Sequence, residues 1–189
     1  MNTRYTYLTD QRDDVEKAKG ELTDIIGGIT GEMTRIFAEQ FQLLNESFQA
    51  TFTEMFGGGQ AQLELEDPED ILNCGIEIKA QPPGKTLKTI SLLSGGEKAL
   101  TAIALLFAIQ NLKPSPFCLL DEIEAALDEN NVARFAKYLH KLTKYTQFIV
   151  ITHRRGTMEK ADRLYGITMQ EKGVSTLVSV NLIDKELDN

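Results

Sequence analysis

The stretch that decides the fold runs from Phe117 to His153 and reads "FCLLDEIEAALDENNVARFAKYLHKLTKYTQFIVITH". It begins and nearly ends with short apolar runs, "FCLL" and "QFIVI", and polar residues follow each run directly. Between the runs, apolar residues recur at helical spacing over 131–145: Val132, Phe135, Leu139 and Leu142. A continuous apolar strand, an amphipathic crossover helix and a second apolar strand are typical of a parallel α/β sheet with buried strands.

The first third of the chain is helical in pattern. Apolar residues recur at spacings of three and four, as in a coiled-coil seam: Val15, Ala18, Leu22, Ile25 and Ile29. Gly27, Gly28 and Gly31 should then interrupt the helix, because each glycine costs a helix about 1 kcal/mol. A second helix carries a stripe that we expect to pack against a neighbouring element: Phe37, Phe41, Leu44, Phe48 and Phe52. "FGGG" (56–59) should end it.

The remaining elements complete an α/β pattern. "AQLELED" and "CGIEIKAQ" alternate and predict two antiparallel strands, and an apolar helix follows Ser94. A short helix is expected near 158–163, before a hairpin of "YGITMQ" and "STLVSVNL" around "EKG". The order strand, helix, strand, helix, strand predicts a mostly parallel sheet with flanking helices. We therefore expect a helical coiled-coil and neck segment over 1–55 and an α/β lobe over 56–189.

Composition narrows the class of protein. The 189 residues are 42% hydrophobic and 25% charged, which is typical of a soluble globular protein. The net charge of −8 argues against a generally basic nucleic-acid surface. Cys74 and Cys118 form no disulfide or metal pattern, and His140 and His153 stand alone, so we expect a reducing cytosol and no zinc site. No apolar run approaches the length of a membrane span, and no signal peptide is evident.

The helix after Ser94 begins in an unusual way. Ser94 and Glu97 stand at capping-box spacing, yet Gly95 and Gly96, both poor helix formers, fill the first turn. A helix start without side chains exposes its N–H groups and the positive end of its dipole. This arrangement favours an incoming phosphate group.

Polar residues also stand at the ends of the two apolar strands. Asp121 is suited to hold Mg²⁺, and the neighbouring Glu122 is suited to accept a proton from an attacking water. His153 ends the second strand at the same sheet edge. Solvated carboxylates and a structural histidine are the simpler interpretations. Asp128 is placed to be a plain helix N-cap and could serve both roles.

A phosphate-loop motif is absent from the sequence. "PPGKT" (82–86) resembles one, but the pattern G-x-x-x-x-G-K-[ST] requires a glycine where Lys79 stands. Two prolines precede it and a strand-like stretch follows, which indicates a surface turn.

The order of the motifs is more specific than any one of them. Ser-Gly-Gly-Glu, an apolar strand with Asp-Glu, Ala-Leu-Asp and an apolar strand with His resembles the second half of an ABC-type ATPase: signature motif, Walker B, D-loop and switch histidine. "LLSGGEKALTAIALLFA", "FGGGQAQLEL" and "TQFIVITHRRGTMEKADRLYGITMQEKGVS" look very like the C-terminal head of prokaryotic structural-maintenance-of-chromosomes (SMC) proteins. The resemblance covers roughly 37–182, and the glycines at 27, 28 and 31 depart from it.

The resemblance implies roles for the candidate residues. Asp121 would support Mg²⁺, Glu122 would be the general base, and His153 would contact the γ-phosphate and the water. A second set would meet the ATP of the opposite head or its interface: Ser94, Gly95, Gly96, Glu97 and Asp128. ATPase activity would then require the N-terminal Walker A half of the same head and a second SMC head, so this chain alone would be inactive.

The resemblance also implies partners and a setting. SMC heads act in chromosome condensation and segregation, bind a kleisin subunit (ScpA-like) and meet DNA through the full complex, in the cytoplasm and on the nucleoid. Three alternatives remain: a Rad50-like or RecN-like DNA-repair ATPase, a non-catalytic partner-docking module, and, more weakly, a transporter ATPase subunit, whose chain would carry Walker A itself.

Overall fold

A computed structural model describes residues 2–181 of the chain. The chain divides into two compact units. The first comprises Met1–Leu43 and Leu65–Ile76, and the second comprises Leu44–Glu64 and Glu77–Asn189. The candidate residues all belong to the second unit.

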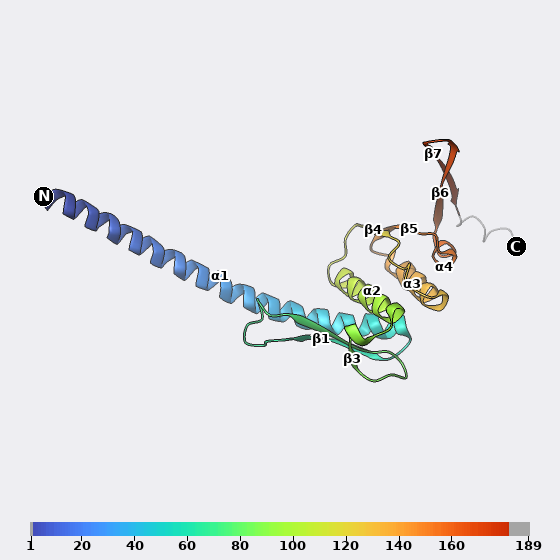
Figure 1. Cartoon of the computed structure of the whole chain (residues 1–189), viewed down its shortest axis with the longest axis horizontal. Helices are drawn as coiled ribbons and strands as arrows, with labels where there is room; N and C mark the ends of the chain where they lie inside the picture. Colours follow the sequence, from blue (N-terminus) through green and yellow to red (C-terminus); the bar gives the residue numbers. More distant parts are fainter. Residues whose placement is uncertain (1, 182–189) are drawn as a thin grey trace. The chain divides into compact units, whose positions relative to one another are not determined.

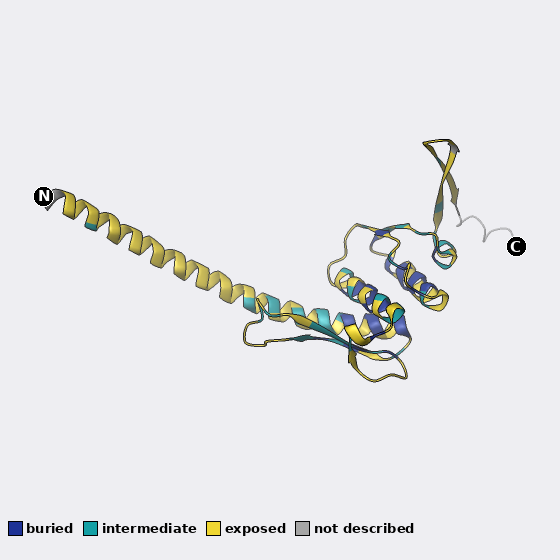
Figure 2. Cartoon of the chain, in the orientation of Figure 1, coloured by how far each residue is buried: buried dark blue, intermediate teal, exposed yellow. Residues whose placement is uncertain are grey.

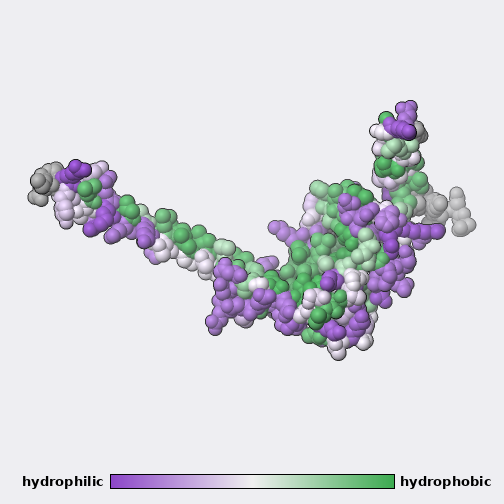
Figure 3. Space-filling model, in the orientation of Figure 1, coloured by the Kyte–Doolittle hydropathy of each residue, from purple (hydrophilic) through white to green (hydrophobic). Residues whose placement is uncertain are grey.

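Helix α1 (Asn2–Phe56) is continuous, so the expected interruption at Gly27, Gly28 and Gly31 is wrong. An added Cβ at any of these glycines would meet no other atom within 4 Å, so nothing packs there to bend the helix. The glycines lower local stability, but the long flanking helical segments propagate through them. In the first unit the predicted seam residues are exposed, in the part of α1 that Figure 2 colours as exposed and along which Figure 3 shows hydrophobic side chains. The Phe37 and Phe41 rings stack at 5.8 Å.

The "FGGG" stretch ends α1, as expected. The Gly58 N–H donates to the Thr53 carbonyl at 2.9 Å, and Gly59 has a φ of +81°. A Cβ at Gly59 would lie 2.2 Å from the Gln81 carbonyl oxygen, so only glycine fits there.

Beyond this turn lies a three-stranded sheet in the order β1 (Gln60–Leu65), β2 (Ile76–Gln81) and β3 (Lys88–Thr89). The Gln60 side chain, at the start of β1, donates to Gln81, at the end of β2, so these strands run antiparallel as predicted. Strand β3 adds a second antiparallel pair.

The core of the second unit is helical. The last turns of α1 pack with α2 (Gly95–Leu112) and α3 (Glu129–Leu142), and a 3₁₀ turn, η1 (Ile90–Leu92), precedes α2 (Figure 1). The fully buried aromatic side chains come from all three helices: Phe48, Phe52, Phe107 and Phe135. The Phe107 and Phe135 rings lie 5.9 Å apart. The packing expected of the stripe is therefore confirmed for Phe48 and Phe52, and the predicted inward face of α3 is buried.

Strands β4 (Phe117–Asp121) and β5 (Gln147–Ile151) pair in parallel, with α3 as the crossover. This confirms the strand–helix–strand unit. The expectation of fully buried strands is wrong, because their side chains alternate. On one face they are half or more exposed: Phe117 63%, Leu119 60%, Ile149 51% and Ile151 51%. The described chain covers only the other face of the pair.

The third strand does not join the parallel pair. Helix α4 (Arg155–Met158) begins earlier than expected and is a single turn, in place of the crossover helix that the strand order predicted. Strand β6 (Arg163–Glu171) instead pairs antiparallel with β7 (Val174–Asn181), which confirms the predicted hairpin. Leu182, the last residue expected in the second strand of this hairpin, lies outside the described residues.

The turn at Gly59 makes a prediction about stability. Gly59→Ala should destabilise the fold more than Gly84→Ala. Both glycines have positive φ, but an added Cβ at Gly84 meets nothing within 4 Å, whereas the Gln81 backbone blocks it at Gly59. Strain at φ costs about 1 kcal/mol in each variant, and the clash adds to it only in Gly59→Ala. Urea unfolding of the two variants measures the difference, and equal losses would contradict the clash.

Candidate functional site

The start of α2 is built from the expected capping box. The Glu97 carboxylate accepts the Ser94 N–H at 3.2 Å and the Ser94 hydroxyl at 2.7 Å. Ser94 is the N-cap residue, and Gly95 and Gly96 form the first turn. The helix therefore begins with two residues that place no side chain over its N–H groups.

Lys85 was not among the predicted site residues, yet it forms an ion pair with Glu97 at the start of this helix. Its ammonium contacts the second Glu97 oxygen at 2.7 Å. The Lys85 ammonium, together with the Ser94 hydroxyl, holds the pKa of Glu97 below its usual value. The signal was present in "PPGK", where a turn places a lysine shortly before the Ser94 helix. The stretch is a surface turn, as predicted, with the Lys85 N–H bonded to the Pro82 carbonyl.

Nothing inside the chain requires glycine at either position of the first turn. An added Cβ at Gly95 would meet no atom within 4 Å. At Gly96 it would meet the Ala126 carbonyl oxygen at 3.5 Å, an ordinary contact. Gly96 therefore lies beside the "ALD" segment, and contacts among the described residues give no reason for the two glycines.

The end of β4 places two carboxylates differently. Asp121 follows Phe117 and Leu119 at a spacing of two, so it lies on the open face of the sheet. Glu122 comes after the strand, with its N–H bonded to the Ile151 carbonyl at 3.0 Å. It has a φ of +47°, and it is the one non-glycine residue with positive φ among residues 2–181. Such strain clusters at functional sites.

Glu122 and His153 are brought together, as predicted. His153 Nδ1 lies 3.2 Å from Glu122 Oε1, and the two side chains are 65% and 54% exposed. The pair is open to solvent and to an incoming ligand. Its geometry suits a carboxylate that takes a proton from water beside an imidazole that orients it.

Asp128 caps α3. One carboxylate oxygen accepts the Asn131 N–H at 2.8 Å, and the other accepts the Asn131 side-chain amide at 3.2 Å. The N-cap interpretation is therefore confirmed, and any role toward a partner would be additional.

Sequence reasoning missed a buried cluster behind the Glu122–His153 pair. Glu124 is fully buried, and its Oε1 accepts hydroxyl hydrogens from Thr152 and Thr157. The available signal was a carboxylate flanked by the apolar residues Ile123 and Ala125.

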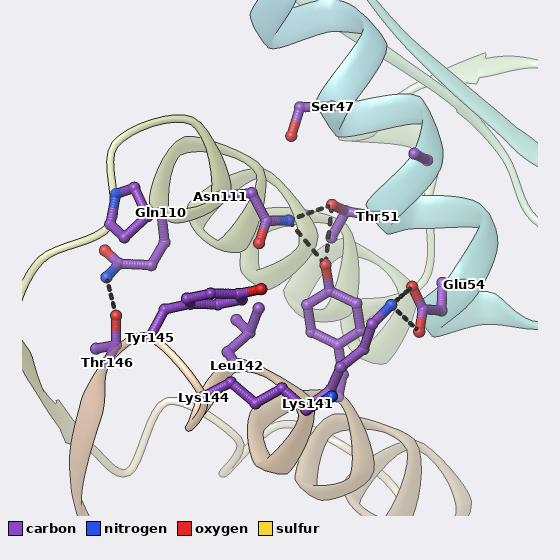
Figure 4. Close-up of a pocket in the computed structure, with 13 residues that line it drawn as sticks. Ser47, Thr51, Glu54, Gln110, Asn111, Lys141, Leu142, Lys144, Tyr145 and Thr146 are labelled. Atoms are coloured by element: carbon purple, nitrogen blue, oxygen red, sulfur yellow. Dashed lines mark hydrogen bonds and ion pairs between the residues drawn. The ribbon is translucent and has the colours of Figure 1, made fainter.

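A hollow of about 510 Å³ lies at the other end of the strands (Figure 4). Pro114 and Thr146, which line it, precede β4 and β5, whereas ligands of α/β sheets bind at the carboxyl ends. Its polar groups largely satisfy one another, as in the pairs Asn111 with Tyr138 and Lys141 with Glu54. We assign this hollow no role in the chemistry.

Within residues 2–181, no group of three or more acidic, histidine or cysteine side chains is placed to hold a metal. One carboxylate is nevertheless compatible with Mg²⁺, which proteins often bind through one or two carboxylates and substrate phosphates. Asp121 fits that mode, and the remaining ligands would be phosphate and water.

Comparison with known proteins shows which family the chain belongs to. The family model described as "RecF/RecN/SMC N terminal domain" matches residues 17–176. The chain belongs to this family. It is 57% identical over 182 residues to the chromosome partition protein Smc of Bacillus subtilis, and 54% identical over 188 residues to that of Desulfitobacterium hafniense. These matches cover 96% and 100% of the chain, which spans only about 15–16% of each relative.

Solved SMC heads share the fold. The Smc head with an extended coiled coil bound to the C-terminal domain of ScpA, from Pyrococcus furiosus, matches with a TM-score of 0.79 and 43% identity, covering 98% of this chain and 46% of that one. A structure titled for ATP-driven dimerization of SMC ATPases matches with a TM-score of 0.74 and 43% identity, covering 82% of this chain and 98% of that one. The fold is therefore the mixed α/β fold of an SMC head.

The comparisons bear on two of our expectations: which half of the head this chain is, and whether it is an SMC protein or a repair ATPase. The family description names an N-terminal domain, so it does not support our placement of the chain in the C-terminal half, which the residues must carry. Both curated relatives above are Smc proteins, which favours SMC over a repair ATPase. No helix among the described residues is long and apolar enough to cross a membrane.

Lys85 makes a prediction about pH dependence. Lys85→Met should raise the pKa of Glu97 toward its usual value, because Lys85 is the largest cause of its depression. A carboxyl group whose pKa is lower in the folded state stabilises the fold at pH values above its unfolded-state pKa. This stabilisation is lost as the pH falls through the folded-state pKa. Lys85→Met should therefore cost a few tenths of a kcal/mol at neutral pH, as partly exposed ion pairs do.

The cost should vanish in acid, and urea unfolding at pH 7 and pH 3 measures it. Lys88→Met, which removes a lysine with no ion pair in the described residues, is the control. A pH-independent loss in Lys85→Met would contradict the assignment to charge.

Proposed function

We propose that this chain is the C-terminal half of an SMC ATPase head. It completes an ATP site with the N-terminal half of the same head and engages a second head when ATP is bound. The observation that carries the proposal is the open apolar face of β4 and β5, with Asp121 at its end. A surface of this kind requires a covering layer.

The open face is unusual for parallel strands. Parallel sheets occur almost only with both faces covered, and exposed apolar area costs about 25 cal/mol per Å² relative to burial. Phe117, Leu119 and Ile149 form a contiguous patch across the two strands. The layer that covers them would also face Asp121, which shares their side of the sheet.

The missing phosphate loop indicates what that layer is. The chain carries the later ABC motifs in order, from Ser94 to His153, but has Lys79 where a phosphate loop needs glycine. A complementary half that brings the phosphate loop to the Asp121 face would complete the nucleotide site. The order of motifs supports the C-terminal placement, although the family description names an N-terminal domain. We place the boundary between neck and lobe at residue 55.

Each residue then has a chemical role. The Glu122 carboxylate accepts the proton of the attacking water, and His153 orients that water and contacts the γ-phosphate. Asp121 holds Mg²⁺, which neutralises phosphate charge when bound. The strained backbone and open position of Glu122 suit a base that must reach a ligand from another segment.

The start of α2 meets a second head in this proposal. Ser94, Gly95 and Gly96 present backbone N–H groups to the γ-phosphate bound on the opposite head, and Glu97 fixes Ser94. Asp128 belongs to the "ALD" segment, which lies beside Gly96, so we place it near the same interface. The absence of any internal need for glycine at 95 supports an external one.

Further partners follow from the relatives. Two matched SMC heads are bound to ScpA domains, so we propose a ScpA-like kleisin as partner. The hairpin offers an exposed surface for it that includes Tyr165, Ile167 and Leu177. Figure 3 shows hydrophobic side chains on the hairpin. DNA contact would come through the full complex, acting in chromosome condensation and segregation, in the cytoplasm and on the nucleoid.

The test is reconstitution with the matching N-terminal half of an SMC head. The chain alone should neither bind ATP tightly nor hydrolyse it. The mixture should copurify and hydrolyse ATP with Mg²⁺, because the covering layer supplies the phosphate loop. Phe117→Glu with Leu119→Glu, on the open face, should abolish copurification, whereas Leu92→Glu, an exposed residue of η1, should not.

Glu122→Gln is the chemical control in the mixture. It should retain ATP binding and lose turnover, because it removes the base and keeps the shape. ATP hydrolysis by the isolated chain would contradict the proposal that it supplies only half of the ATP site. A copurified pair that binds ATP without turnover would favour the non-catalytic docking module.

Gly95→Ala separates folding from head engagement. In the chain it should be neutral or stabilising by up to about 1 kcal/mol, because alanine is the better helix former and no atom obstructs it. In the reconstituted head it should weaken ATP-dependent dimerisation, because the new methyl group faces the incoming phosphate.

Gly27→Ala is the matched control, since it lies in α1, has equal space around it and should leave dimerisation unchanged. Thermal unfolding and light scattering with ATP measure the two effects. Full dimerisation of the Gly95→Ala variant would remove Gly95 from the interface.

A further inference from the structure

His153 stands between two residues that are both bonded to the segment after Glu122. Thr152 precedes it, and its hydroxyl donates to Glu124 Oε1 at 2.5 Å. Arg154 follows it, and its guanidinium donates to the Leu127 carbonyl at 2.6 Å and lies 3.3 Å from Glu129. The backbone on each side of His153 is therefore tied to the 124–129 segment.

The two ties are themselves joined. The Arg154 N–H donates to the Thr152 hydroxyl oxygen at 3.0 Å, while that hydroxyl donates onward to Glu124. Donors and acceptors in series strengthen one another in a low-dielectric environment. This short chain of hydrogen bonds determines the backbone direction at His153, although the imidazole itself is exposed.

Glu124 is an unusual anchor. It is fully buried, and burying a carboxyl group is costly unless its atoms are bonded. Its Oε1 accepts two hydroxyl hydrogens, from Thr152 and from Thr157 at 3.0 Å, but its Oε2 has no partner in the described residues. Arg154 Nε is likewise buried without a partner in that part of the chain. A core that only needed stability would not keep these groups, which indicates a positional role.

We propose that Glu124, Thr152 and Arg154 are positioning residues that hold His153 against Glu122. The network couples the "ALD" segment, which lies beside Gly96, to the histidine through the Leu127 carbonyl. A second head that presses on that segment would act on His153 through these bonds. The catalytic consequence rests on the proposed function; the geometric claim about His153 does not.

Two threonines allow a matched comparison. Thr152 and Thr157 donate to the same Glu124 oxygen, and Thr→Val removes each hydroxyl with little change of shape. Thr152 adjoins His153, and its hydroxyl accepts the Arg154 N–H. Thr157 lies on α4 and meets Arg154 only through its backbone N–H, which donates to the Arg154 carbonyl at 3.2 Å and stays in place when the hydroxyl is removed. A purely structural role for Glu124 would make the two variants equivalent.

The first readout needs no ATPase. The chain holds two histidines, so ring signals of His153 and His140 are separable by NMR of the ¹³C-histidine-labelled chain at one pH. Thr152→Val should shift or broaden the His153 signals and leave His140 unchanged. Thr157→Val should leave both unchanged, and Thr152→Ser should restore the wild-type spectrum. Thermal unfolding confirms that each variant is folded.

The second readout uses the head reconstituted with its N-terminal half. Thr152→Val should lower kcat by about ten- to a hundredfold with little change in KM for ATP, because displacement of a catalytic group affects the transition state. Thr157→Val should keep kcat close to wild type, and Thr152→Ser should recover it.

The outcomes separate the two proposals. Unmoved His153 signals in folded Thr152→Val, or equal movement in Thr157→Val, would overturn the positioning role. Should the wild-type reconstituted head show no turnover, the proposed function fails, and the His153 signals alone decide the positioning role.

Discussion

Two parallel strands with a single covered face are the constraint on which the rest of this structure depends. β4 and β5 carry apolar side chains on both sides, and α2 and α3 belong to the core of the second unit, which buries Leu120 on one side. The other side stays open, and Asp121 lies at its carboxyl end. Any layer that buries the apolar side chains of this face also lies over Asp121. Burial and chemistry are thus linked at one sheet edge.

Under the proposed function, this link is a physical reason for activity to depend on assembly. Glu122 and His153 are already in contact, and their support behind the sheet edge, through Glu124 and Thr152, is already built. What the chain lacks is a group that binds phosphate on the open side. A covering layer that brings such a group would bind through the apolar face of β4 and β5. Its binding free energy would come from apolar area removed from water, so the reacting residues need not contribute to it.

Sequence patterns predicted the elements that depend on local rules. The capping box at Ser94, the inward face of α3 and the glycine stop after Phe56 are set by neighbours within a few residues, and all are present. Errors arose where the outcome depends on what lies outside a segment. An apolar run such as "FCLL" predicts a strand buried on both faces, but periodicity cannot say whether the covering layer belongs to the same chain.

The other misses have the same origin. Gly27 and its neighbours do not break α1, because propensity is a weak penalty once long flanking turns are formed. The strand beginning at Arg163 pairs with its hairpin partner, and only a single-turn helix precedes it. Glu124 and Lys85 act through contacts with residues distant in sequence, at Thr152 and Glu97, which no local pattern contains.

Residues without a reason inside the chain are therefore the most informative about function. Gly59 is required by the Gln81 backbone, so the fold itself explains why glycine stands there. Gly95 has no such requirement, yet it occupies a position where alanine would make a better helix. The apolar side chains of Phe117 and Leu119 are equally unexplained by the fold they belong to. The described residues leave one helix start and one sheet face unexplained, and the proposed nucleotide held between assembled heads would account for both.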